Sequence, residues 1–138
     1  MRTRCPSFFL PVFALAAALS ALPAWALDFK LSGSQEVPPV DTSADGRGTI
    51  DVASDGAVAG TLTTSNMTGT AAHIHHGAAG KNGPVVVHFT KTGDNTWSVV
   101  RGARLTPDQL RAYRAGELYV NVHSPAYKDG EVRAQLIP

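Results

Sequence analysis

The chemistry that this sequence offers is concentrated in its histidines. His73 and His75 form a His-x-His pair in one alternating segment, and His123 ends a second alternating segment. Successive side chains on a strand point to opposite faces, so His73 and His75 share a face, with imidazoles roughly 6–7 Å apart. Neutral imidazole nitrogen suits copper, zinc and nickel. If the two segments lie near each other, His73, His75 and His123 form a transition-metal site that prefers Cu(II) to Zn(II).

The remaining histidines are weaker ligand candidates, although His76 or His88 could supply a fourth nitrogen. His76 ends its segment, and we expect it to be exposed. His88 alternates with Val87 and Phe89, which favours an ordinary surface position on a strand. The alternative for the His-x-His pair is structural, with both imidazoles forming hydrogen bonds on a half-buried polar strand.

Alternation also predicts which side chains surround the histidines. Residues 119–123 and 131–136 alternate apolar with polar side chains and are close enough in sequence to pair. We expect Asn121, Glu131 and Arg133 to share the histidine face, where Asn121 and Glu131 would orient the imidazoles. The residues predicted to face the core are Ile74, Val120, Val122, Val132 and Leu136.

Turn signals at short intervals divide the chain into strands, as in an antiparallel sandwich or barrel. Asp55-Gly56 is typical of a two-residue type I′ hairpin. A capping box at 106–109 with proline in the first turn, followed by Gly116, predicts one short crossover helix over 107–115. The predicted strands are 29–34, 49–54, 57–64, 70–76, 84–90, 96–101, 117–123 and 131–137.

Composition narrows the class of protein. The chain has 138 residues, which favours a single domain, and 43% of them are hydrophobic, enough for an ordinary core. Its formal net charge of +1 argues against a nucleic-acid binder, which normally carries a strongly basic face. Its single cysteine cannot form an internal disulfide.

Residues 1–26 are typical of a secretory signal peptide. Two arginines open the segment, an apolar run follows over 8–22, and Ala-Trp-Ala at 24–26 fits a cleavage site before Leu27. The alternative is a membrane anchor, but the apolar run is short for a span of about 20 residues.

Cleavage there would leave a domain of residues 27–138. It would contain no cysteine and would carry 10 basic against 11 acidic groups, a net charge of −1. We expect it to be periplasmic or secreted, to fold without disulfides, and to have no membrane span after cleavage.

Several stretches together resemble the CHRD domain, a module named from chordin and also found singly in bacterial secreted proteins. The resemblance spans about 28–138 in order, with Ala134 where a glycine is usual. It implies an all-β, antiparallel, immunoglobulin-like Greek-key sandwich, and it implies little about activity. The matching stretches are 31–40, 72–80 with 83–86, 116–123 and 130–136.

The histidine pattern is also similar to that of copper/zinc superoxide dismutases, Greek-key barrels that hold copper with a His-x-His strand and a late-strand histidine. His73, His75 and His123 match those ligands in type and chain order. This chain lacks a disulfide, a recognisable zinc-ligand cluster and a clear bridging histidine. The similarity therefore implies a copper-binding site and leaves a complete dismutase site in doubt.

We therefore expect an extracytoplasmic CHRD-type binding module that holds a transition metal, copper first, at His73, His75 and His123. No other cofactor, no nucleic-acid partner and no catalytic residue is predicted. One alternative is a metal-free module that binds an unidentified protein or matrix component through its sheet face or loops. The other is a dismutase-like copper enzyme.

Overall fold

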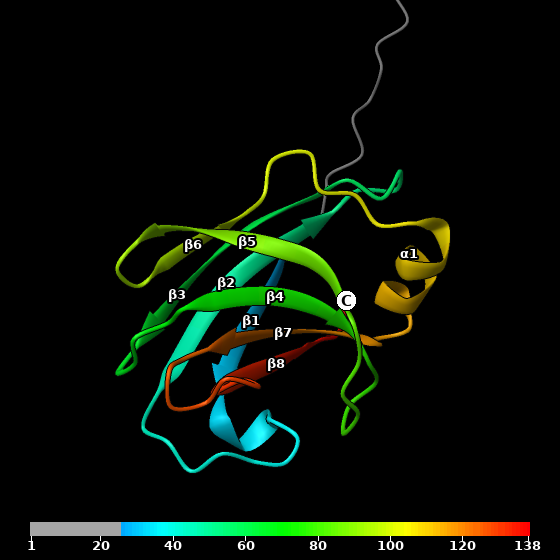
Figure 1. Ribbon diagram of the computed structural model, residues 1–138. Helices are drawn as coiled ribbons and strands as arrows, with labels where there is room; N and C mark the ends of the chain where they lie inside the picture. The colour runs from blue at the N-terminus through cyan, green and yellow to red at the C-terminus, as the bar shows by residue number, and fades with distance from the viewer. Residues whose placement is uncertain (1–25) are drawn as a thin grey trace, which may run out of the picture.

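The computed structural model describes residues 26–138, so nearly all of the predicted signal peptide lies outside the described residues (Figure 1). Two helices accompany the strands, the 3₁₀ helix η1 (Gly33–Gln35) and the α-helix α1 (Pro107–Arg114). Neither of these described helices is long and apolar enough to cross a membrane. The strands are β1 (Leu27–Ser32), β2 (Asp45–Val52), β3 (Val58–Ser65), β4 (Ala71–His76), β5 (Val85–Gly93), β6 (Thr96–Val99), β7 (Leu118–His123) and β8 (Val132–Leu136).

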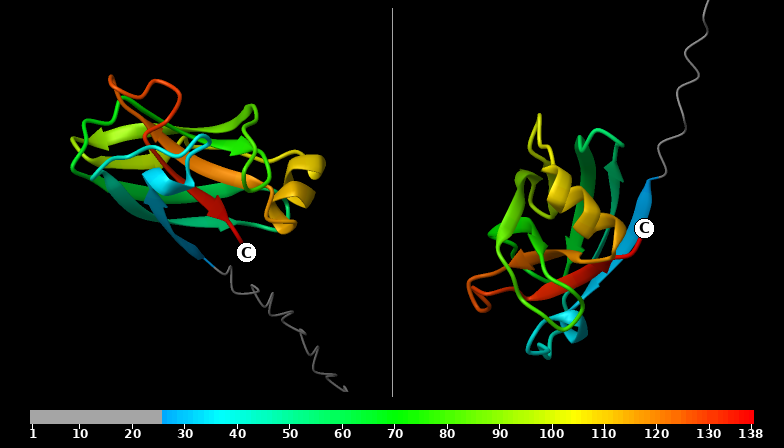
Figure 2. Two further views of the ribbon diagram at one scale, coloured as in Figure 1. Left: turned by 90° about the horizontal axis from the view of Figure 1, so that it is seen from below. Right: turned by 90° about the vertical axis from the view of Figure 1, so that its right-hand side faces the viewer.

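The strands close into one antiparallel barrel in the order β1-β2-β3-β6-β5-β4-β7-β8 (Figures 1 and 2). The predicted all-β antiparallel class with one short helix is confirmed, but the predicted immunoglobulin-like sandwich is wrong. A sandwich consists of two sheets packed face to face. Here β1 pairs with both β2 and β8, and β3 pairs with β6, so every strand has a neighbour on each side.

The β2–β3 hairpin forms as predicted, but its turn is of another type. A type I′ turn needs a positive φ at both central residues. Among residues 53–56 only Gly56 has one, at 89°, and its N–H donates to the Ala53 carbonyl at 2.9 Å. Gly56 thus ends a turn over 53–56 in the left-handed region, where a non-glycine residue would be strained.

The barrel interior holds the predicted core. Val120, Val122, Val132 and Leu136 are fully buried, Ile74 is 1% exposed, and all five belong to the hydrophobic core cluster, which confirms the assigned strand faces. α1 lies at one end of the barrel (Figure 1), where Ala112 and Tyr113 join the core cluster. Its predicted capping box is present, and it ends one residue earlier than predicted.

One wall of the barrel is covered on its outside as well. Every residue of β7 from Leu118 to Val122 is buried, although alternate side chains point outward. The β4–β5 connection, the β7–β8 connection and the segment after η1 bond to this outer face through contacts such as Gln135 Nε2 to Gly77 O at 2.8 Å. The outward polar side chains of His75, Asn121 and Arg133 are therefore buried rather than solvated.

Candidate metal centre

The outer face of β4 and β7 brings the three predicted ligands together. The two strands pair directly, with Ala71 opposite His123 and His73 opposite Asn121. One ligand nitrogen from each of His73, His75 and His123 lies within 4.8 Å of the other two. The ring centroid of His73 is 5.6 Å from that of His75 and 5.0 Å from that of His123. The strand proximity on which the sequence-based site depended is therefore present.

Backbone carbonyls determine which nitrogen of two histidines carries the proton. His75 Nδ1 lies 2.9 Å from Gly83 O, and His123 Nδ1 lies 2.8 Å from Lys128 O. A carbonyl can only accept, so each Nδ1 bears a hydrogen, and each Nε2 of the neutral ring keeps a lone pair. Metal-binding histidines characteristically donate their other ring N–H in this way.

The third histidine completes the set through its Nδ1. His73 Nδ1 is 3.1 Å from His123 Nε2. Because His123 Nε2 is an acceptor, His73 Nδ1 carries the proton between them in the metal-free protein. If that proton moves to Nε2 of the His73 ring, the Nδ1 lone pair faces His123 Nε2, and a cation can take the proton's place.

Burial favours the neutral form of two of the three rings, those of His73 and His75. Burial, followed by the neighbouring His123, His75 and His88, lowers the pKa of His73 to about 4. Burial also lowers the pKa of His75, against the opposing effect of its hydrogen bond to Gly83. His75 is only 8% exposed, and its Nε2 is buried without a hydrogen-bond partner. Neutral imidazoles with available lone pairs are the form that binds metal.

The two remaining histidines lie outside this group. His76 is exposed, as predicted, and its Nε2 is 3.9 Å from a Glu117 carboxylate oxygen. His88 on β5 is also exposed, as expected for a surface strand residue. Its ring packs edge-on against His73 at 4.9 Å, but it is not one of the three whose nitrogens converge.

The aromatic ring of Tyr119 stacks on the His75 ring and holds its orientation. The Tyr119 ring lies parallel to the His75 ring, with centroids 4.9 Å apart and planes 5° apart. The Tyr119 hydroxyl accepts the Gly83 N–H at 3.2 Å, so one side chain supports both the imidazole and the loop residue that binds it. Arg133 lies over the same ring, with its Cζ 3.5 Å from the centroid.

Tyr119 was not predicted to belong to the site, whereas Asn121 lies on the histidine face as predicted. Strand alternation puts Tyr119 on the face of Asn121 and His123, and that signal was available. Asn121 is 2% exposed and its side chain lies close enough to both His75 and Glu36 to influence their pKa values.

Glu131 takes a different partner from the expected one. Its carboxylate accepts a 2.7 Å hydrogen bond from Thr42 Oγ1 in the segment after η1, rather than orienting an imidazole. This partner lies 89 residues away in the chain, and strand alternation carries no information about such a contact.

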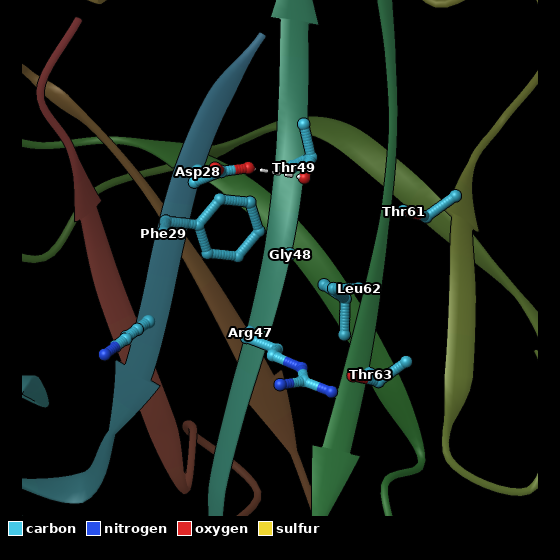
Figure 3. Close-up of a pocket in the computed structure, with 9 residues that line it drawn as sticks. Asp28, Phe29, Arg47, Gly48, Thr49, Thr61, Leu62 and Thr63 are labelled. Atoms are coloured by element: carbon cyan, nitrogen blue, oxygen red, sulfur yellow. Dashed lines mark hydrogen bonds between the residues drawn. The ribbon is translucent and has the colours of Figure 1, made fainter.

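A separate hollow of about 660 Å³ lies on β1, β2 and β3 (Figure 3). A hydrogen bond of 2.8 Å from Thr49 Oγ1 to Asp28 crosses it. β2 stands four places from β4 in the ring of strands, so this hollow is on the opposite wall from the histidines. No histidine lines it, so it is not part of the candidate metal centre.

Comparison with known protein families shows which family this chain is related to. The CHRD domain family matches residues 27–136. The chain belongs to the CHRD family. The matched range begins with the first residue of β1 and ends with the last residue of β8, so the CHRD domain and the closed barrel coincide. Comparison with curated proteins and with solved structures gave no significant match.

Proposed function

We propose that this CHRD domain is an extracytoplasmic module that binds a transition metal, copper in preference to zinc, through His73, His75 and His123. The convergence of three ligand nitrogens within 4.8 Å carries the proposal. The extracytoplasmic location is supported by the signal-peptide pattern before Leu27.

The environment of His75 favours metal binding over a purely structural role. Buried polar atoms nearly always have a partner, and leaving one unsatisfied costs about 1–3 kcal/mol. His75 Nε2 is buried without one, while Nδ1 of the same ring is held by Gly83. A cation bound by the three nitrogens would satisfy this atom.

The ligand types favour copper. The three converging ligands are all imidazoles, and no thiolate or carboxylate belongs to the group among residues 26–138. For nitrogen ligands the divalent affinity order places copper above zinc and nickel.

Calorimetric titration of the protein with Cu(II) and with Zn(II) tests the proposal. We expect one copper per chain, bound more tightly than zinc. His73→Ala, His75→Ala and His123→Ala should each weaken copper binding sharply, whereas His88→Ala, which removes an exposed neighbour of His73, should have a much smaller effect.

Two results would contradict the proposal. If the wild-type protein binds no copper, the metal-free interaction module is the better description. If the triple alanine variant binds copper as tightly as the wild type, the site lies elsewhere. A superoxide assay on the copper-loaded protein then separates a binding module from a dismutase-like enzyme.

A further inference from the structure

We propose that the buried positive charge of Arg133, held behind His75 by Tyr119, makes this site select monovalent copper, Cu(I), over divalent metal ions. The inference rests on the proposed copper site and names the oxidation state that the site favours. Among divalent ions the site still binds copper more tightly than zinc. The further selection is for Cu(I), which we expect to bind more tightly than Cu(II).

The stack places a cation close to the ligands. β7 lies between β4 and β8 in the barrel, so the Tyr119 ring has His75 on one side and Arg133 on the other. The guanidinium carbon is 3.5 Å from the ring centroid, and His75 is stacked 4.9 Å away across the ring. Only the thickness of one aromatic side chain separates the charge from a metal ligand.

No carboxylate accepts a hydrogen bond from the Arg133 guanidinium among the described residues. The side chain is 1% exposed. Its N–H groups donate to three uncharged oxygen atoms: Asn82 Oδ1, Ala78 O and Gln135 Oε1. Arginine stays protonated in proteins. The nearby acid is Glu36, and burial raises its pKa to about 7, so at neutral pH it is only partly ionised. The positive charge is therefore incompletely balanced.

An unbalanced buried charge distinguishes between the two copper ions. Three neutral imidazoles add no negative charge to the site, so the bound metal keeps its full charge. Repulsion by Arg133 is then twice as large for Cu(II) as for Cu(I), and a poorly solvated environment screens it weakly. Three ligands also fall short of the tetragonal set that Cu(II) prefers.

The reduction potential of the bound copper is the direct test. A site that holds Cu(I) more tightly than Cu(II) has a potential above that of the aqueous copper couple, and we expect this for the wild-type protein. Arg133→Gln should lower the ratio of Cu(I) to Cu(II) affinity by at least about tenfold, which is about 59 mV for one electron.

Two control variants separate charge from structure. Arg133→Lys disturbs the same stack and hydrogen bonds but keeps the charge, so its potential should stay closer to the wild-type value. Arg104→Gln removes a charge from an exposed side chain paired with Asp55, and should leave the potential unchanged.

Two outcomes would overturn the inference. A wild-type potential at or below that of the aqueous couple would do so without any variant. So would an Arg133→Gln protein that binds copper with an unchanged potential. Failure of the wild-type protein to bind copper in either oxidation state would instead overturn the proposed function itself.

Discussion

Burial of the histidine rings determines the pH range in which this site can bind metal. With an ordinary pKa near 6.5, protons would compete with metal from that pH downward. Burial and the surrounding imidazoles lower the pKa of His73 to about 4, and burial lowers that of His75. A lowered pKa keeps the ring neutral to a lower pH, so the competition at these two ligands moves in the acid direction.

We therefore predict that copper binding persists below pH 6.5 and is lost as the pH approaches about 4. Affinity measurements across this range check the prediction. A loss of binding that is already complete by about pH 6 would contradict this prediction.

Gly83 permits a contact that no other residue type would allow. A Cβ at this position would lie 1.7 Å from His76 O, so the backbone would have to move. The carbonyl of Gly83 accepts the His75 Nδ1–H. We expect Gly83→Ala to weaken copper binding by about 10- to 100-fold, the usual effect of losing a residue that orients a metal ligand.

Gly80→Ala is the matched control in the same loop. Gly80 has a φ of 77° but open space around its missing Cβ. The substitution should cost about 1–2 kcal/mol of folding stability through backbone strain, with copper affinity unchanged. Equal copper affinities for the two variants would show that the Gly83 carbonyl does not orient His75.

At the scale of elements, β7 carries the core on one face and the site on the other. Val122 is fully buried, whereas its neighbour His123 is only partly buried and bonds to the β7–β8 connection. Val122→Asp should prevent folding, because an unpaired buried carboxylate costs several kcal/mol. Thr63→Asp on the exposed face of β3 is the control and should fold normally.

Circular dichroism and thermal unfolding compare the folding of the Val122→Asp and Thr63→Asp variants. A normally folded Val122→Asp protein would contradict the assigned strand faces.

Local patterns predicted the strand faces, the helix, and the pairing of strands close in sequence, β2 with β3 and β7 with β8, but not the pairing of distant strands. Alternation placed Val120 and Val122 inside and His123 outside, since side-chain direction depends only on position along a strand. The pairing of β4 with β7 joins residues about 50 positions apart, such as His73 and Asn121, and alternation carries no information on that. For the same reason the pairing of β1 with β8, which turns the predicted sandwich into a barrel, could not be foreseen.

The surroundings of the site were predicted least well. Arg133 was correctly placed on the histidine face, and a surface position would be ordinary for arginine. Instead it is 1% exposed, because the β4–β5 connection supplies two of its acceptors, at Ala78 and Asn82. Loop conformations of this kind depend on tertiary packing and leave no periodic signal in the sequence.

At the scale of the whole molecule, the start of the barrel coincides with the predicted cleavage site. Leu27 is the first residue of β1 and pairs with Ile50, so cleavage before it leaves every strand intact. We expect the protein recovered from its native host to begin at or near Leu27 and to lie outside the cytoplasm. N-terminal sequencing of fractionated cells checks this, and a cytoplasmic protein with Met1 intact would refute it.

Crystals of the copper-loaded protein, measured on both sides of the copper absorption edge, test the central claim most directly. We predict one copper peak per chain, bonded at roughly 2.0 Å by Nδ1 of His73 and by Nε2 of both His75 and His123. Copper at other residues would contradict this site. So would copper-treated crystals that kept the 3.1 Å contact between His73 Nδ1 and His123 Nε2 with no metal between them.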